Sequence, residues 1–278
     1  MHVLREALAK FLEEDIGKGD ITSEIIPVDP VNAEIVCKER AVIAGLHEAQ
    51  LLFEIVNCRS KNLIEEGSFV KPKTRIMIVN GNARSILSAE RTVLNVLMRM
   101  SGIATETRKF VDEVRKVNDN VRIACTRKTA PGFRIFDKRA VKVGGGETHR
   151  MRLDDMVLIK DNHLTIIGSV SKAVKRARQT YGSRSKIEVE VRSMKDAIEA
   201  INAGANIIML DNLTVRQVQT IVRALRKKRL RDAMTIEVSG GVTHENAKRY
   251  ASADIDVISI GSITHSVKAI DMSLEIIA

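Results

Sequence analysis

The stretch KIEVEVRSMKDAIEAINAGANIIMLDN, residues 186–212, decides the fold class. Two apolar, β-branched runs at 186–193 and 205–212 have the composition and length of buried strands. The segment between them, 194–203, is typical of a helix. A strand, a helix and a second strand in about 30 residues form the unit from which parallel α/β sheets are built.

The same alternation continues on both sides of this unit. Further strand-like runs occupy 121–128, 155–162, 235–241 and 256–261, and we expect helices at about 165–181, 213–231 and 243–251. Successive strands are roughly 20–30 residues apart, as repeated strand–helix units require. The second half of the chain is therefore predicted to form a parallel α/β sheet or barrel.

The first hundred residues have a different pattern, with short strands between helices. A long helical stretch starts at Ser88, and we expect a second helix from Thr105 to about Val117. We place the domain boundary near 103–110, which gives a first domain over 1–105 and a second over 106–262. A final helix is expected over 263–278, and the sequence leaves open whether it packs on the first domain.

Composition excludes several classes of protein. The chain has 278 residues, 44% of them apolar, so it can bury a core and is not disordered. It contains no apolar run of the length that a transmembrane helix needs, and its charged, amphipathic start does not resemble a secretory signal. Cys37, Cys58 and Cys125 match neither a disulfide framework nor a metal spacing, so we expect a protein of the reducing cytoplasm.

The formal net charge of +10 points to anionic partners. Nucleic acid is one possibility and a small polyanionic substrate is another. The basic run at 223–232 contains no aromatic residue, so stacking on a single strand is unsupported, and we expect a solvated helix face.

Polar residues and glycines close every predicted strand of the second half. In parallel α/β folds the carboxyl ends of the strands face one mouth, where ligands bind. We therefore expect these strand-end residues to meet at one site: Thr126, Arg127, Lys128, Lys160, Glu190, Asp211, Ser239, Gly240, Gly241, Ser259, Ile260 and Gly261.

The residue types indicate what this mouth binds. Arginine pairs with carboxylates through two parallel hydrogen bonds, so the cations predict a pocket for carboxylates: Arg127, Lys128, His149, Arg150 and Lys160. Glu190 and Asp211 are either ligands of a hard cation such as Mg²⁺ or salt-bridge partners of Lys160. The turns at 239–241 and 259–261 expose backbone N–H groups ahead of helices, which favours phosphate binding.

Two further patterns bear on the chemistry. Gly144-Gly145-Gly146 lacks the context of a nucleotide fingerprint, and it is either a flexible loop that lets His149 and Arg150 approach a ligand or a plain connector. No Ser-His-Asp order, Cys-His pair or zinc spacing is present, so covalent nucleophilic catalysis and a zinc site are disfavoured.

These motifs together resemble the quinolinate phosphoribosyltransferase family over nearly the whole chain. The segments that carry the resemblance are EEDIGKGDIT at 13–22, SAERTVLNVLMRMSGIATET at 88–107, TRKTAPGFRIFDKRAVKVGGGETHRMRLDDMVLIKDNH at 126–163, EVEV at 188–191, MLDN at 209–212, SGGV at 239–242 and ISIGSITHS at 258–266.

The resemblance implies a glycosyltransferase of NAD biosynthesis. It would transfer phosphoribose from phosphoribosyl pyrophosphate to quinolinate with Mg²⁺, and release carbon dioxide, pyrophosphate and nicotinate mononucleotide. The implied fold is an N-terminal α/β sandwich followed by an incomplete α/β barrel. The implied assembly is a homodimer, with further association into hexamers left open, and neither nucleic acid nor membrane is an expected partner.

The resemblance also implies roles for individual residues. Arg127, His149, Arg150 and Lys160 match the quinolinate pocket, which Arg91 of a second protomer would complete. Thr126 and Lys128 lie beside it, with Lys128, Lys160, Glu190 and Asp211 as the catalytic set. Glu190 and Asp211 match the acidic pair near the ribose and the metal, while the two glycine turns match the phosphate sites.

The sequence departs from the family's pattern at one place, and it leaves three other functions open. Glu147-Thr148 stands where many relatives have an uncharged pair, and a carboxylate there would weaken dicarboxylate binding unless it faces away. The rivals are a transferase for another aromatic acid such as nicotinate, a nucleic-acid-binding protein, and a non-catalytic barrel subunit.

Overall fold

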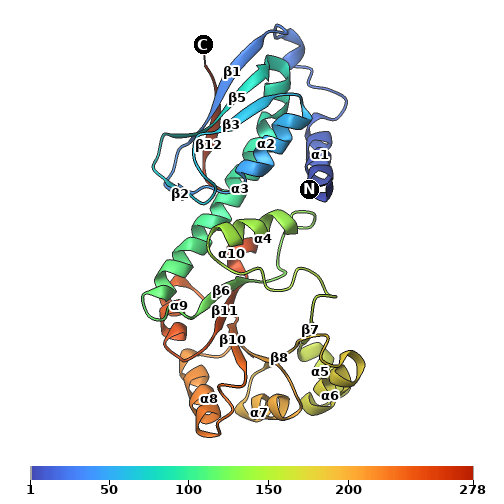
Figure 1. Cartoon of the computed structure of the whole chain (residues 1–278), viewed down its shortest axis with the longest axis vertical. Coiled ribbons are helices and arrows are strands. Elements are labelled where there is room, and N and C mark those ends of the chain that lie inside the picture. Colours follow the sequence, from blue (N-terminus) through green and yellow to red (C-terminus); the bar gives the residue numbers. More distant parts are fainter. Residues whose placement is uncertain (1, 278) are drawn as a thin grey trace. The chain divides into compact units, whose positions relative to one another are not determined.

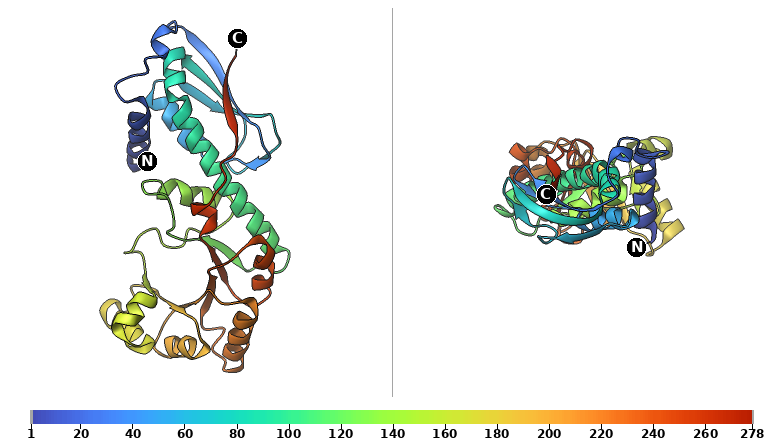
Figure 2. Two further views of the ribbon diagram at one scale, coloured as in Figure 1. Left: turned by 180° about the vertical axis from the view of Figure 1, so that it is seen from behind. Right: turned by 90° about the horizontal axis from the view of Figure 1, so that it is seen from above.

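The computed structural model describes residues 2–277 of the chain (Figures 1 and 2). The chain divides into two compact units. The first comprises residues 1–108, 130–145 and 266–278, and the second comprises 109–129 and 146–265. The sequence pattern predicts a second domain over all of 106–262, whereas residues 130–145 cluster with the first unit in the structure.

A four-stranded antiparallel sheet forms the centre of the first unit, in the order β12-β1-β5-β3. Its strands are β1 (Pro30–Cys37), β3 (Arg59–Asn62), β5 (Thr74–Asn82) and β12 (Met272–Ile277), and β2 (Ala41–Val42) pairs separately with β4 (Phe69–Val70). The helical elements of the unit are α1 (His2–Ile16), η1 (Ser23–Ile25), α2 (Leu46–Ile55), most of α3 (Ala83–Arg115) and α4 (Arg134–Val143).

Apolar stripes attach these helices to the core of the first unit. Leu4, Leu8 and Leu12 of α1 are buried, as their spacing over successive turns predicts. Helix α1 packs against α2, and α2 packs against β3. On α4, the buried Asp137 accepts two hydrogen bonds from Arg99 of α3, at 2.8 and 2.9 Å.

Helix α3 is one continuous helix, so our expectation of two helices joined near Thr105 is wrong. Gly102 does not interrupt the helix. A glycine is required at this position by a close packing contact and not by a turn of the chain. A side chain at position 102 would have its Cβ 2.2 Å from the Lys268 carbonyl oxygen. The glycine therefore lets the C-terminal segment pass against the helix.

The expected helix over 263–278 is also wrong. Only Ser262–His265 is helical (α10), and Met272–Ile277 forms β12, which pairs antiparallel with β1 from Asn32↔Ile277 to Cys37↔Met272. Figures 1 and 2 both show this strand along the edge of the first unit's sheet. The edge of β1 offers unpaired backbone N–H and C=O groups, and these groups bind the C-terminal segment as a strand. The sequence of that short segment does not reveal a partner so far away in the chain.

The second unit is built on a six-stranded, wholly parallel sheet in the order β6-β11-β10-β9-β8-β7. Its strands are β6 (Arg122–Cys125), β7 (Val157–Ile159), β8 (Ile187–Val191), β9 (Ile207–Asp211), β10 (Thr235–Ser239) and β11 (Val257–Ile260). Because β6 and β7 remain the two edges within the described residues, the sheet is the predicted incomplete barrel.

Helices connect and cover these strands (Figure 1). They are α5 (Asp161–Ile167), α6 (Val170–Tyr181), α7 (Met194–Asn202), α8 (Val215–Lys227) and α9 (His244–Ala251). Ser193 and Thr214 begin α7 and α8 as side-chain caps. No helix within residues 2–277 combines the length and the apolar character needed to cross a bilayer.

Candidate active site

A cavity of about 570 Å³ opens at the carboxyl ends of the parallel strands, wholly within the second unit. The structure brings twelve of the predicted site residues to its wall: Thr126, Arg127, Lys128, His149, Arg150, Lys160, Glu190, Asp211, Ser239, Gly240, Gly241 and Ser259. The alternation of strands and helices thus places residues from all six strands or the segments that follow them around one pocket.

Three predicted residues do not line this cavity. Ile260 is buried in β11, and Gly261 follows it with Lys128 and His265 close by. Arg91 is an exposed residue of α3 in the first unit, so its contribution to a site stays a prediction.

The cations of the cavity wall come from the segments that follow β6 and β7 and from the segment that precedes β7. Arg150 is buried, and burial together with neighbouring Arg127 lowers the pKa of its guanidinium. The Nε of Arg127 is buried and has no hydrogen-bond partner among residues 2–277. A buried N–H donor without an acceptor is costly, so this group favours an anionic ligand.

The acidic residues of the wall are paired with cations. Lys160 and Glu190 form a short ion pair across β7 and β8. Arg192 lies 3.2 Å from Asp211 and 3.6 Å from Asp161, measured from its Nη2 to a carboxylate oxygen. Sequence reasoning did not identify Arg192 because it stands one residue beyond β8 in a run read only as a strand.

The glycine turn after β10 is constrained by its neighbours. Gly240 has φ of +83°, and a Cβ there would lie 2.2 Å from Oδ1 of Asn212. Asn212 itself donates to Asp211 through Nδ2 at 2.8 Å. The turn and the end of β9 are therefore packed so closely that only glycine fits.

The second glycine cluster, 144–146, ends α4. A Cβ on Gly144 would lie 2.6 Å from the carbonyl oxygen of Ala104 in α3, and Gly145 has φ of +92°. These positions require glycine for helix packing and chain reversal. The adjacent Glu147 does not line the cavity, and its carboxylate instead pairs with Arg122 at 3.1 Å.

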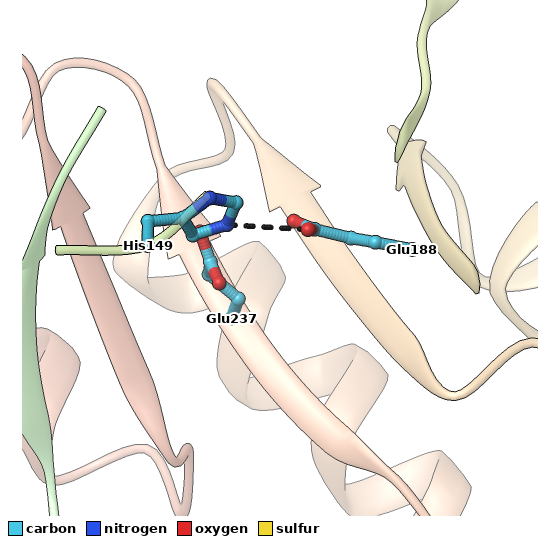
Figure 3. A group of neighbouring side chains, drawn as sticks. All are labelled: His149, Glu188 and Glu237. Carbon is cyan, nitrogen blue, oxygen red and sulfur yellow. Dashed lines mark ion pairs between the residues drawn. The ribbon is translucent and has the colours of Figure 1, made fainter. Parts of the chain in front are cut away.

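Two buried glutamates, Glu188 and Glu237, lie against His149 (Figure 3), and of the three residues His149 and Glu237 line the cavity. Nε2 of His149 is 3.2 Å from Oε2 of Glu188 and 3.5 Å from Oε1 of Glu237. Glu188 is fully buried, and apart from this ion pair with His149 its carboxylate oxygens have no hydrogen-bond partner among residues 2–277. Glu237 accepts a short hydrogen bond from the Ser259 hydroxyl.

Electrostatics couple these three groups. Burial by itself lowers the pKa of His149, but the Glu188 and Glu237 carboxylates outweigh it and raise that pKa from 6.5 to about 10. Burial raises the pKa of Glu188, against the opposing effect of His149. Sequence reasoning missed both glutamates because, within strands, they alternate with apolar residues and look like solvent-facing positions.

The three side chains are the one group of His, Cys, Asp and Glu in residues 2–277 with the proximity to hold a metal ion. The tautomer of His149 argues against that use. The Arg150 backbone N–H donates to Nδ1 at 2.8 Å, so the ring proton lies on Nε2, the atom that a metal would need.

Comparison with known proteins gives the family. Models described as quinolinate phosphoribosyl transferase N-terminal and C-terminal domains match residues 20–101 and 103–275. The chain is 47% identical to a probable carboxylating nicotinate-nucleotide pyrophosphorylase of Archaeoglobus fulgidus, over 93% of this chain and 98% of that protein. It is 37% identical to the carboxylating nicotinate-nucleotide pyrophosphorylase of Rattus norvegicus, over 96% and 89%.

A solved structure agrees with these sequences. The nicotinate-nucleotide pyrophosphorylase of Francisella tularensis superposes with a TM-score of 0.90 at 35% identity, covering 99% of this chain and 96% of that one. Human nicotinic acid phosphoribosyltransferase, at 12% identity and a TM-score of 0.63, shares the fold alone.

Proposed function

The chain belongs to the quinolinate phosphoribosyltransferase family, and from that premise we propose how its pocket performs the family reaction. The enzyme transfers phosphoribose from phosphoribosyl pyrophosphate to the ring nitrogen of quinolinate. Carbon dioxide and pyrophosphate leave, and nicotinate mononucleotide is the product that enters NAD synthesis.

The buried, unpartnered Nε of Arg127 is the observation that carries the assignment of the acceptor end. Arg127, Arg150, Lys160 and His149 together receive the two carboxylates of quinolinate. Charge-assisted hydrogen bonds of this kind contribute about 1.5–3 kcal/mol each. Because Glu147 pairs with Arg122 outside the cavity, it leaves this dicarboxylate site undisturbed.

The glycine turns take the phosphates of the donor. Ser239, Gly240 and Gly241 precede α9, and backbone N–H groups in such a turn complement a phosphate. Ser259 contributes from the end of the neighbouring strand β11, while Gly261, which follows that strand, lies outside the cavity wall. Lys128 and Lys160 offset the charge that develops on the departing pyrophosphate.

The two acidic residues of the cavity wall offer oxygen ligands of the kind that Mg²⁺ prefers. One carboxylate oxygen of Glu190 pairs with Lys160, and one carboxylate oxygen of Asp211 pairs with Arg192 and Asn212. The second oxygen of each carboxylate could therefore serve as a hard ligand for the ion. These two residues would hold the ion together with substrate phosphates, where it supplies charge neutralisation for the leaving group. They also face the ribose, where they offset positive charge on the oxocarbenium-like sugar.

The assembly and the compartment are further parts of the proposal. A homodimer would let Arg91 of one protomer reach the acceptor pocket of the other, and it could associate further into a hexamer. Cys37, Cys58 and Cys125 are buried and none is in a disulfide, which supports the cytoplasm. Arg226 and Arg231 of the basic run pair with Asp254 and Asp256, so local partners account for part of that charge.

A comparison of acceptors tests the function. Purified protein, phosphoribosyl pyrophosphate and Mg²⁺ are combined with quinolinate or nicotinate, and nicotinate mononucleotide is measured. We expect kcat/KM to favour quinolinate by about ten- to a hundredfold, since nicotinate lacks one charge-assisted carboxylate contact of about 1.5–3 kcal/mol. Equal or better use of nicotinate would contradict the two-carboxylate pocket.

A further inference from the structure

Arg192 is a cation of the cavity wall to which the reaction proposed above assigns no role. It directly follows β8, whose last residue, Val191, is in register with Leu210 of β9. Arg192 therefore stands level with Asp211, which in turn is in register with Ser239 at the start of the glycine turn. Neighbouring strand ends thus bring together an arginine, a carboxylate and a turn that suits phosphate.

Two aspartates of the cavity wall hold one nitrogen of the Arg192 guanidinium. Nη2 lies 3.2 Å from Oδ2 of Asp211, at the end of β9, and 3.6 Å from Oδ2 of Asp161, the first residue of α5. Within residues 2–277 the side chain makes no other hydrogen bond or ion pair, so Nε and Nη1 have no protein partner. A side chain that lines the cavity and is 60% exposed offers these donors to a ligand.

These contacts of Arg192 do little for the stability of the fold. An ion pair whose arginine is exposed gains little free energy, because water screens the charges and the side chains lose freedom. Oδ2 of Asp211 also accepts a hydrogen bond from Asn212 at 2.8 Å, so a second group holds this carboxylate. The arrangement is therefore better explained by a ligand than by the packing of the strand ends.

The negative charge of Asp211 shows why a polyanion needs an arginine at this place. A phosphate beside an unpaired carboxylate is repelled, and this repulsion is stronger in a pocket than in bulk water. Lys160 neutralises Glu190, and Arg192 does the same for Asp211. The five N–H groups of an arginine allow it to pair with a carboxylate and to bind a phosphate oxygen at the same time.

We propose that Arg192 binds the diphosphate of phosphoribosyl pyrophosphate through the N–H groups that the protein leaves free. Asp161 and Asp211 are positioning residues that orient the guanidinium. The diphosphate is the part of the donor assigned to it because Arg192 stands two residues after Glu190, whose partner Lys160 offsets the charge of the leaving pyrophosphate. This inference rests on the proposed function and adds a donor-binding residue to it.

Binding of the two phosphate-bearing parts of the donor tests the proposal without turnover. Pyrophosphate and ribose 5-phosphate are titrated calorimetrically, each by itself, into the wild-type enzyme and into Arg192→Ala, both with Mg²⁺ and in EDTA. We expect Arg192→Ala to raise the pyrophosphate Kd roughly tenfold in both conditions, because one charge-assisted contact is lost. The Kd of ribose 5-phosphate should change by less than about twofold, because it loses no contact.

Arg216→Ala is the matched control, because Arg216 is an exposed arginine of α8 in the same unit and does not line the cavity. It removes the same charge and should bind pyrophosphate as the wild type does. An Asp211→Asn background separates a direct contact from an effect through Asp211. Arg192→Ala should still weaken pyrophosphate binding there by a similar factor, because Asp161 continues to orient the guanidinium.

A measurement on the wild-type enzyme does not depend on the folding of any variant. Phenylglyoxal modifies exposed arginines, and mass spectrometry of the peptides reports the modification at Arg192. Pyrophosphate should protect Arg192 from the reagent, whereas ribose 5-phosphate should not.

Four results would overturn the proposal. They are a wild-type enzyme that binds no pyrophosphate in either condition, an unchanged pyrophosphate Kd in Arg192→Ala, a loss that disappears in the Asp211→Asn background, and an equal loss of ribose 5-phosphate binding. Missing protection from phenylglyoxal would count against it equally. Each of these leaves the reaction assignment intact if the wild-type enzyme converts quinolinate, whereas an enzyme without quinolinate turnover would overturn the function itself.

Discussion

Arg127 shows what a single residue contributes to the site. Its place after β6 was evident from the sequence, because polar residues follow an apolar run there. Its buried Nε without an acceptor could only be seen once the neighbouring strands enclosed it. The type and approximate place of most pocket residues could thus be predicted, whereas their pairing could not.

Arg127→Ala should abolish tight quinolinate binding while the fold stays intact. Losing a charge-assisted carboxylate contact of about 3 kcal/mol raises the Kd roughly a hundredfold. Calorimetry with quinolinate measures this change. Arg122→Ala, which removes an exposed arginine that pairs with Glu147, is the control and should bind normally. Unchanged affinity in Arg127→Ala would remove Arg127 from the pocket.

Glu188 and Glu237 show the limit of reading single residues. Each alternates with apolar neighbours, and that pattern is typical of a strand with one solvated face. In the structure both glutamates are buried and their carboxylates lie against His149. Only the folded sheet, with His149 packed against it, distinguishes these two cases.

At the scale of elements, the parallel strands were predictable because each is a short β-branched run bounded by turns. Helix α3 and strand β12 were not predicted correctly, and both errors involve the same contact region. Gly102 lets Lys268 approach α3, and β12 then completes the sheet beside β1. Local periodicity contains no information about such long-range pairing.

The turn after β10 supports a sharp test. Gly240→Ala should destabilise the fold by about 1–3 kcal/mol through its left-handed backbone, with an additional clash against Asn212. It should also raise the KM for phosphoribosyl pyrophosphate. Gly241→Ala shares the positive φ but meets no atom within 4 Å, so it should cost only about 1 kcal/mol. Urea unfolding of both variants measures the difference, and equal losses would refute the predicted clash.

The link between α3 and α4 is a second test at this scale. Asp137 is fully buried and accepts two hydrogen bonds from Arg99, so Asp137→Asn should lower the free energy of unfolding by about 3 kcal/mol. The exposed Arg152–Asp154 pair serves as control, and Asp154→Asn should cost no more than about 1 kcal/mol. A loss of similar size in both variants would show that burial does not decide the strength of the Arg99 contact.

At the scale of the whole molecule, the two units have different roles. The cavity lies within the second unit, while the first contributes an antiparallel sheet and the exposed Arg91. Composition and strand spacing predict that the two halves of the chain differ in architecture. They could not show that residues 130–145 belong with the first unit, because that assignment depends on contacts with α3.

Shared sites in a dimer predict complementation. Arg91→Ala and Lys160→Ala should each be nearly inactive alone. Mixed dimers of the two variants contain one site that lacks neither residue, so activity should return to roughly a quarter to a half of wild type, depending on the extent of subunit mixing. Steady-state assays after subunit exchange measure the recovery. Verified mixed dimers without recovery would show that Arg91 does not act across an interface.

The central claim is that one pocket joins the sugar to quinolinate and releases its carboxylate. The most direct measurement follows quinolinate labelled with ¹³C in the 2-carboxylate, and compares labelled carbon dioxide with pyrophosphate as both accumulate. We predict equal amounts of the two products and of nicotinate mononucleotide. Pyrophosphate and mononucleotide formed without labelled carbon dioxide would contradict the account.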